Sequence, residues 1–257
     1  MQEDSPKSVQ FVELFHLLFL DQMGRKISKQ HYTLKGGCNL RFFLKSIRYS
    51  QDMDIDINTV RVETLKGAIN RLLDSTPFQL ILRAKEIELV NYSMSKQTET
   101  TQRWKMHLKL PYSSIQANTK VEFSRRSSEE FSLFESIDST IINTYKLTPI
   151  YASHYSPEVA FRQKIWALIL RTATQARDVF DLFHLLNIGV KIDCAPKEMF
   201  EKLDLAQENA LSINYDAFKS QVISYLPTAY QQQYDTPELW DSMIVNVCDC
   251  LKRLPCA

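Results

Sequence analysis

The sequence has no strong charge imbalance. Its 257 residues include 31 Lys and Arg against 30 Asp and Glu, which leaves a formal net charge of +1. Composition therefore gives no sign of a strongly basic nucleic-acid-binding protein or of a chain with an acidic tail. Any site for a polyanion must come from a local patch of basic side chains.

Cysteine is sparse and poorly placed for metal or disulfide chemistry. The five cysteines are an odd number, and only Cys248 and Cys250 lie close together in the sequence. One C-x-C pair does not make a closed zinc site, and an odd set does not make a disulfide framework. A protein of the reducing cytoplasm is the expected class.

Long hydrophobic runs are missing as well. The most apolar stretch, residues 11–20, is too short to span a bilayer and contains Glu13 and His16. Apolar side chains recur at helical spacing over residues 9–23, and Gly24 follows where a left-handed cap would end a helix. We therefore expect a core helix here and no membrane association.

The apolar content, 44% hydrophobic and 11% aromatic residues, is enough to bury a full core. In the first part of the chain, alternation and helical spacing predict a mixture of strands and helices. The expected strands are residues 31–34, 52–57, 78–92, 103–110, 120–123 and 149–151, and the expected helices are residues 39–44 and 59–73. Residues 93–102 fit an exposed hairpin loop, and residues 124–139 fit a loop or a short helix.

Helical signals dominate after residue 155. Ser156 is a good N-cap and Pro157 suits the first helical position, while breaks are expected near Gly189, Pro196 and Pro227. We expect an α+β fold with two domains. Residues 1–155 should form a mixed β-sheet with flanking helices, and residues 156–257 a helical domain that packs on it and completes a cleft.

Two acidic residues are the first candidates for chemistry. Asp52 and Asp54 lie two apart on a predicted strand, so their carboxylates share one face while Met53 and Ile55 point into the core. Such a pair suits a hard divalent cation. Asp-x-Asp is also common as a solvated strand face, so this signal alone is weak.

A glycine pair supplies a second candidate. Gly36 and Gly37 precede a predicted helix, whose free N–H groups and positive dipole end could meet a phosphate. Gly-Gly is otherwise often only a turn. The acidic pair and the glycine pair together make up the two halves of a phosphoryl-transfer site.

Residues 164–186 form a third block. Lys164 and Arg171 are two helical turns apart and project from one face, and Asp178 and Asp181 also share a face if they lie on a separate helix. The ordinary alternative is that Lys164 is a solvated surface residue and that Arg177, Asp178 and Asp181 form caps and surface ion pairs.

These three blocks resemble the nucleotidyltransferases of the AbiEii/AbiGii toxin family. That family has Gly-Gly before a helix, Arg-x-Ser-x-Asp-x-Asp on a strand, and Lys-x-x-Ala-x-x-x-Arg followed by Arg-Asp-x-x-Asp-Leu. The matching segments here are residues 34–43, 48–56 and 164–186, in the family's order. Their joint occurrence is much more specific than any one of them.

The resemblance implies a nucleotidyltransferase-like fold and a role for each matching residue. Gly36 and Gly37 would hold nucleotide phosphates, Asp52 and Asp54 would bind Mg²⁺ or Mn²⁺, and Lys164 would contact the triphosphate. Asp178 would lie at the active cleft as a further catalytic residue. Nucleotide contacts are also implied for Cys38, Arg41, Ser50, Arg171, Arg177 and Asp181.

The sequence departs from the family pattern at two places. Cys38 stands where many relatives have Thr or Ser, so a hydroxyl contact to phosphate is replaced by a weak thiol donor. His107 takes the expected position of a third carboxylate. Asp178 or Asp56 could substitute for that carboxylate, one well-held ion could suffice, or His107 could be an ordinary sheet histidine.

The expected activity is Mg²⁺-dependent transfer of a nucleoside monophosphate from a nucleoside triphosphate to a hydroxyl of RNA, such as transfer RNA, or of a protein. The resemblance also implies a toxin of a two-gene toxin–antitoxin or phage-defence system, with an antitoxin protein as partner. Two other hypotheses for the function stay open. One is a non-catalytic interaction module that has kept the fold, and the other is a metal-dependent phosphohydrolase.

Overall fold

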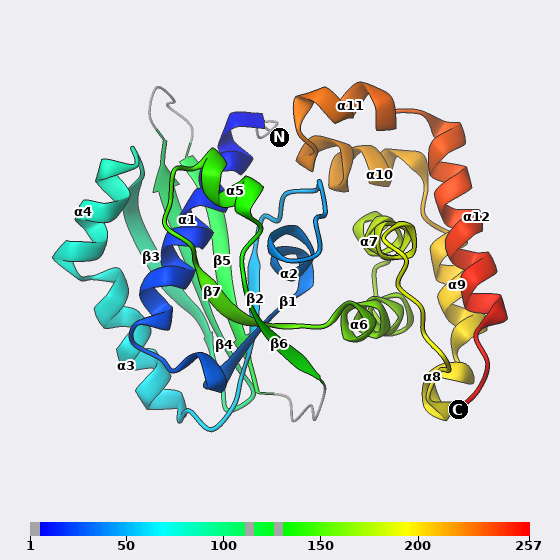
Figure 1. Cartoon of the computed structure of the whole chain (residues 1–257), viewed down its shortest axis with the longest axis horizontal. Helices are drawn as coiled ribbons and strands as arrows, with labels where there is room; N and C mark the ends of the chain where they lie inside the picture. Colours follow the sequence, from blue (N-terminus) through cyan, green and yellow to red (C-terminus); the bar gives the residue numbers. More distant parts are fainter. Residues whose placement is uncertain (1–5, 111–115, 126–130) are drawn as a thin grey trace. The chain divides into compact units, whose positions relative to one another are not determined.

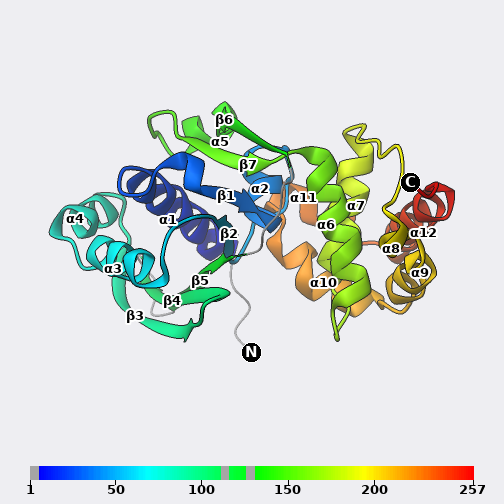
Figure 2. The same ribbon diagram turned by 90° about the horizontal axis from the view of Figure 1, so that it is seen from below.

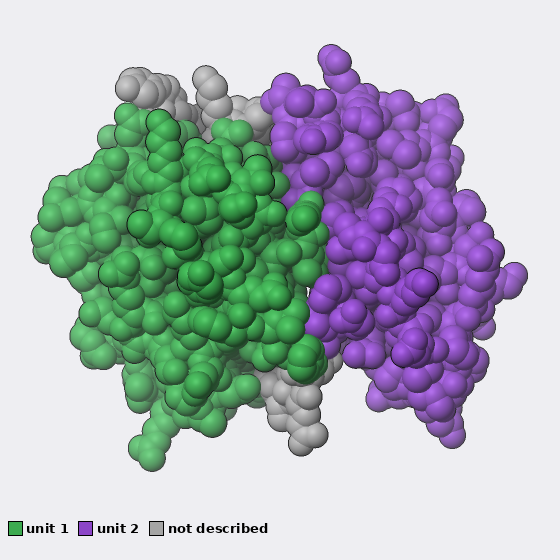
Figure 3. Space-filling model, viewed as in Figure 1, with its two compact units in different colours: residues 1–45, 49–155 green, residues 46–48, 156–257 purple. Residues whose placement is uncertain are grey.

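The computed structural model of the chain describes residues 6–110, 116–125 and 131–257. It divides into two compact units, which Figure 3 shows in different colours. The first unit is Met1–Lys45 with Tyr49–Tyr155, and the second is Ser46–Arg48 with Ser156–Ala257. Within the described ranges, every helix is too short or too polar to cross a bilayer.

The first unit is built on one mixed sheet of seven strands (Figures 1 and 2). The strand order is β3-β4-β5-β2-β1-β7-β6, in which β2 pairs in parallel with β5, β1 pairs in parallel with β7, and the other neighbours are antiparallel. The strands are β1 (Tyr32–Lys35), β2 (Met53–Ile57), β3 (Glu88–Gln97), β4 (Thr101–Lys109), β5 (Gln116–Ser124), β6 (Ser132–Ser136) and β7 (Tyr151–Tyr155). The helices of this unit are α1 (Pro6–Gly24), η1 (Lys29–His31), α2 (Gly36–Phe42), α3 (Val62–Leu73), α4 (Thr76–Ala84) and α5 (Ser139–Thr144).

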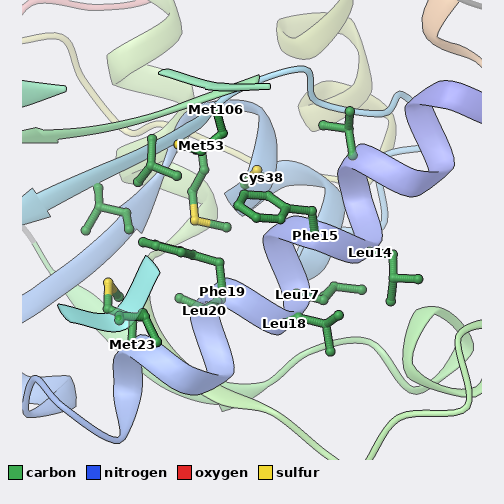
Figure 4. Close-up of a cluster of buried hydrophobic side chains, with 14 of the residues drawn as sticks. Leu14, Phe15, Leu17, Leu18, Phe19, Leu20, Met23, Cys38, Met53 and Met106 are labelled. Carbon is green, nitrogen blue, oxygen red and sulfur yellow. The ribbon is translucent and has the colours of Figure 1, made fainter. Parts of the chain in front are cut away.

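The core lies between one face of this sheet and helix α1. Figure 4 shows Phe15 and Phe19 of α1 with Met53 of β2 and Met106 of β4, and all four are buried. Met53 and Ile55 are fully buried, as the period of two predicts. The side chains that alternate with them therefore lie on the opposite face of the sheet.

Most of the predicted elements of this unit are confirmed, one is wrong and one is displaced. The strand predicted at residues 149–151 is β7, which begins at Tyr151 and runs to Tyr155. The predicted strand at residues 78–92 is instead helix α4 followed by β3, because Ser75 caps the helix by accepting a hydrogen bond from the Phe78 N–H and Pro77 lies in its first turn. The hairpin loop predicted at residues 93–102 is shorter, since β3 and β4 extend into it. The segment predicted as loop or short helix at 124–139 contains β6, and its residues 126–130 lie outside the described ranges.

The second unit is helical, as predicted for residues after 155. Its helices are α6 (Pro157–Leu170), α7 (Ala176–Asn187), α8 (Lys197–Phe200), α9 (Leu203–Leu211), α10 (Tyr215–Gln221), η2 (Ile223–Tyr225), α11 (Thr228–Tyr234) and α12 (Pro237–Arg253). The Ser156 side chain accepts a hydrogen bond from the Val159 N–H and caps α6. In the core, Phe218 stacks on Trp240 with ring centroids 4.5 Å apart. The packing of this unit on the first stays a prediction.

Candidate active site

Strand β1 runs directly into helix α2 at Gly36, and this turn lies close to the Asp54 carboxylate. Gly36 has a φ of +64°, which favours glycine, and a Cβ at this position would lie 3.1 Å from Oδ2 of Asp54. Lys35, the N-cap of α2, offers no side-chain cap to the first-turn N–H groups. A phosphate held at these N–H groups would therefore lie beside the Asp54 carboxylate.

Asp52 and Asp54 lie at the start of β2 on the face opposite the core. Asp54 is half-buried, and its carboxylate accepts no hydrogen bond within the described part of the chain. Burial raises the pKa of Asp54, and the neighbouring carboxylate of Asp52 raises it further. Asp52 forms an ion pair with Lys120 of β5 at 3.0 Å. Lys120 and Lys35 lower the pKa of Asp54, but burial is the largest effect and the net shift is upward. Two neighbouring carboxylates of this kind suit a shared divalent cation.

The backbone that carries Asp52 is held by two side chains. The Asp52 carbonyl accepts hydrogen bonds from the Ser50 hydroxyl at 2.7 Å and from the Cys38 thiol at 3.3 Å. The preceding carbonyl, of Gln51, accepts a 2.7 Å bond from Thr119. Ser50 and Cys38 therefore position the acidic pair through its backbone.

The Cys38 thiol is not placed for the phosphate contact that the resemblance implies. It is buried in the core, where burial raises its pKa well above the usual range, and it lies 3.7 Å from Nδ1 of His16. Burial lowers the pKa of His16 to about 3, so the ring is neutral. Of the donors of Cys38, the backbone N–H in the first turn of α2 is the one that lies at the glycine turn.

Asp56, the third acid of β2, is occupied by structural contacts. Its carboxylate forms a 2.5 Å ion pair with Lys35 and accepts hydrogen bonds from the hydroxyls of Ser124 and Tyr155. It is buried. Asp56 therefore ties β2 to its neighbours and does not supply a free third carboxylate.

Glu122 of β5 is the carboxylate that the sequence did not reveal. In the parallel pairing of β2 with β5, Glu122 lies directly beside Asp54 and on the same face. Its own ion pair is with Arg103 of β4 at 2.5 Å. The alternation of residues 120–123 marks Glu122 as polar, but only the strand pairing shows that it is level with Asp54.

The expectation that His107 holds the third-carboxylate position is wrong. His107 of β4 pairs with Asn118, whereas Arg103 pairs with Glu122, so His107 lies four residues further along the strand, about 13 Å away.

The donor set fits a magnesium ion. Mg²⁺ usually takes one or two carboxylates from a protein, with waters and substrate phosphates as its other ligands. Within the described residues, no group of three or more His, Cys, Asp or Glu side chains is close enough to hold a metal by itself. Asp52 and Asp54 would therefore hold the ion together with the phosphates of the nucleotide.

A second cluster of predicted residues lies in the second unit. Lys164 of α6 contacts Asp178 at 2.9 Å and Asp181 at 2.7 Å, and both carboxylates, on α7, are fully buried. Arg171 lies 3.2 Å from Asp178, and the Arg48 guanidinium donates hydrogen bonds of 2.9–3.1 Å to both carboxylate oxygens of Asp181. Although burial alone would raise the pKa of Asp181, Arg48 and Lys164 hold it below its usual value.

This cluster excludes the surface interpretation of Lys164, Asp178 and Asp181. All three side chains are buried, and the two carboxylates face three cations, which leaves one positive charge in excess. Arg171 is its most exposed member, with 37% of its side chain accessible. The cluster can therefore offer a cation to an anion while keeping its own carboxylates paired.

The other predicted contacts are placed less favourably. The Arg41 guanidinium forms a 2.6 Å ion pair with Glu13 and lies over the ring of Tyr49, so it joins α2 to α1. Arg177 is half-buried in the first turn of α7. The prediction that Lys164 looks toward Asp52 and Asp54 stays a prediction.

Comparison with known proteins identifies the family of this chain. A family model described as "Nucleotidyl transferase AbiEii toxin, Type IV TA system" matches residues 18–239. The structure is similar to that of JHP933 from Helicobacter pylori, with a TM-score of 0.56 and 15% identity over 96% of this chain and 90% of that one. A second H. pylori structure, titled as a nucleotidyltransferase candidate, gives a TM-score of 0.56 and 16% identity over 98% of both chains.

The two structural likenesses show the fold, and the search of curated proteins gives no significant match. The family match spans most of the chain, including the glycine turn, the acidic pair and the Lys164 cluster. The chain therefore belongs to the AbiEii family of nucleotidyl transferase toxins.

Proposed function

We propose that this nucleotidyltransferase moves a nucleoside monophosphate from a nucleoside triphosphate to a hydroxyl group of RNA, with transfer RNA as one such acceptor. The observation that carries the proposal is the close approach of Gly36 to the Asp54 carboxylate, where a Cβ would lie 3.1 Å from Oδ2. It joins a phosphate-binding turn to a cation-binding pair within one unit. A protein hydroxyl is the alternative acceptor.

The residues of the first unit have distinct tasks in this reaction. A magnesium or manganese ion held by Asp52 and Asp54 would neutralise charge on the phosphates. The first turn of α2 orients the triphosphate, so that the acceptor oxygen attacks the α-phosphorus in line with the leaving group. The bond to the β-phosphate breaks, and pyrophosphate leaves. Glu122, on the same sheet face, is the carboxylate that takes the proton of the attacking hydroxyl.

The family assignment supports a role as the toxin of a two-gene system with an antitoxin partner. We propose that modification of an RNA acceptor is the toxic event. We place the reaction in the cytoplasm, where the five free cysteines would stay reduced.

Incubation with each α-labelled triphosphate, Mg²⁺ and total RNA tests the proposal directly. Label should appear in RNA on a denaturing gel, and chelation of the metal should abolish it. Label in protein would reassign the acceptor, and phosphate release without labelled product would indicate a phosphohydrolase. Triphosphate binding with no turnover would indicate a non-catalytic interaction module.

Glu122→Gln gives a sharper prediction within the same assay. We expect transfer to fall at least a hundredfold while triphosphate affinity stays within about twofold, because general-base catalysis contributes roughly 10²–10⁴ to the rate. Glu63→Gln is the matched control, since Glu63 is an exposed carboxylate on α3 of the same unit. Transfer by Glu122→Gln at the wild-type rate would remove Glu122 from the mechanism.

A further inference from the structure

Two aromatic side chains are exposed at the edge of the sheet. Phe134 of β6 is 58% exposed and Tyr151 of β7 is 47% exposed. Their rings stack with centroids 6.0 Å apart. Single exposed apolar residues are ordinary, but two adjacent exposed rings form a surface that can bind a planar partner.

A lysine completes this surface. The ammonium of Lys29 lies 5.6 Å from the centroid of the Phe134 ring. Ser153 donates a 2.7 Å hydrogen bond to the Lys29 carbonyl, and a Cβ on Gly24 would come within 3.2 Å of Cε of Lys29. The backbone of Lys29 is thus anchored to β7, and Gly24 leaves room for its stem. The Lys29 ammonium therefore belongs to the same surface as the two rings.

The chain beside the rings is basic. Residues 22–31 include two lysines and one arginine and no Asp or Glu. Asp21 pairs with Arg25 at 3.1 Å, so the two lysines remain as excess charge. The acid of β6, Glu135, pairs with His154 at 3.4 Å on the opposite face of the sheet. Positive charge beside stacked rings favours a polyanion with planar bases over an apolar protein surface.

The rings lie on the same sheet face as the acidic pair. Phe134 is opposite Ser153 in register, and two positions further along β7 the Tyr155 hydroxyl donates to Asp56. Since side chains alternate, Phe134 shares a face with Asp56 and Asp54. Three strand spacings across the sheet and two residues along it place the Phe134 backbone about 16 Å from that of Asp54. A few linked nucleotides cover such a span.

We propose that Phe134, Tyr151 and Lys29 form a stacking site for an unpaired base of a single-stranded RNA acceptor. A base stacks on the rings, and Lys29 neutralises the neighbouring phosphate. The acceptor hydroxyl, a few nucleotides away, then reaches the site of Asp52 and Asp54. This inference rests on the proposed transfer to RNA and names how that acceptor is bound.

Binding without nucleotide or metal tests the site separately from catalysis. Fluorescence polarisation is measured with a short end-labelled oligoadenylate and with an abasic strand of equal length. We expect Phe134→Ala and Tyr151→Ala each to weaken oligoadenylate binding roughly tenfold. Phe134→Leu should lose nearly as much, because it keeps an apolar side chain but no ring. Lys29→Met should reduce the slope of log Kd against log salt by up to about one.

Leu80→Ala is the matched control, because Leu80 of α4 is also 58% exposed in the same unit, and it should bind like the wild type. Equal binding of the abasic strand, or wild-type binding by Phe134→Leu, would overturn the stacking site. A change in oligomeric state of the alanine variants by light scattering would instead assign the rings to a protein interface and overturn it too. The binding assay contains no triphosphate and is independent of transfer. If the protein binds oligoadenylate as expected but does not transfer a nucleotide to RNA, only the proposed function is contradicted.

Discussion

At the scale of single residues, the site depends on a close approach that only glycine allows. Gly36 combines a positive φ with a position where a Cβ would lie 3.1 Å from Asp54 Oδ2. Gly189 also has a positive φ, +85°, but open space around its missing Cβ. A comparison of the two glycines therefore distinguishes the cost of a left-handed backbone, which both share, from the effect of the close approach to Asp54, which Gly36 makes.

We predict that Gly36→Ala and Gly189→Ala each lower the free energy of unfolding by about 1–2 kcal/mol, the cost of a left-handed conformation for alanine. Only Gly36→Ala should also lose triphosphate and Mg²⁺ binding, because its methyl group displaces Asp54. Thermal unfolding and isothermal titration measure the two effects. Wild-type triphosphate affinity in a folded Gly36→Ala protein would contradict the assigned phosphate turn.

The acidic pair gives a prediction that depends on pH. Burial and Asp52 raise the pKa of Asp54 in the folded chain above its unfolded value. Between these two values the folded state binds more protons, so stability falls as pH rises through that window. The ionised Asp54 carboxylate therefore destabilises the folded state above the folded-state pKa, and this destabilisation is absent below the unfolded-state pKa.

Asp54→Asn should therefore abolish transfer and leave the metal-free melting temperature equal to or above that of the wild type at pH 7. The gain should vanish as pH falls below about 4, where the wild-type carboxyl is also neutral. Mg²⁺ should raise the melting temperature of the wild type and not that of the variant. A variant several degrees less stable than the wild type at pH 7 would show that Asp54 has a structural role.

At the scale of elements, buried ion pairs connect α6, α7 and residues 46–48 within the second unit. Arg48 and Asp181 are 5% and 0% exposed, so removing one partner leaves a buried charge with weaker compensation. Arg48→Met should cost about 3–5 kcal/mol of unfolding free energy. The double variant Arg48→Met/Asp181→Leu should recover much of this loss, because both charges are then gone.

The exposed pair of Lys202 and Glu198 is the control for this measurement. Its side chains are 39% and 75% exposed, so Lys202→Met should cost less than about 1 kcal/mol. Urea unfolding of the four proteins gives the comparison. A double variant that is less stable than Arg48→Met alone would show that the site tolerates no apolar replacement.

The same scale shows where sequence patterns succeed. The period of two at residues 52–57 was decisive, since it placed Met53 in the core and Asp54 on the opposite face, both as observed. The apolar residues at 78–92 led to the wrong prediction of a single strand, because β-branched and aromatic side chains are common to strands and buried helices. Ser75 and Pro77 were the local signal for helix α4.

At the scale of the whole molecule, the missing information was strand pairing. Glu122 became a site residue only through the parallel alignment of β2 with β5, and Tyr155 reaches Asp56 across 99 positions of sequence. Neither contact leaves a periodic signal, because each depends on the order of strands in the sheet. The sequence identifies Asp178 and Asp181 as charged residues, but it does not show that both carboxylates are fully buried.

The excess positive charge of the second unit leads to the last prediction, that triphosphate binding needs the cations of the Lys164 cluster. Three cations face two carboxylates in the Lys164 cluster, and a triphosphate is the anion that would use the surplus. Arg171 is 37% exposed and Lys164 only 10%, so Arg171→Gln should bind triphosphate less tightly with little loss of stability.

Lys164→Gln should weaken triphosphate binding about tenfold or more, but it also leaves Asp178 and Asp181 with fewer partners, so its melting temperature must be measured alongside. Lys164→Arg keeps the charge and should restore only part of the affinity, because the guanidinium is larger and planar. Lys202→Met, from the same unit, is the control. If Arg171→Gln and a folded Lys164→Gln bind triphosphate like the wild type while Asp54→Asn loses Mg²⁺-dependent binding, the nucleotide is held by the first unit alone, and the Lys164 cluster serves only the fold.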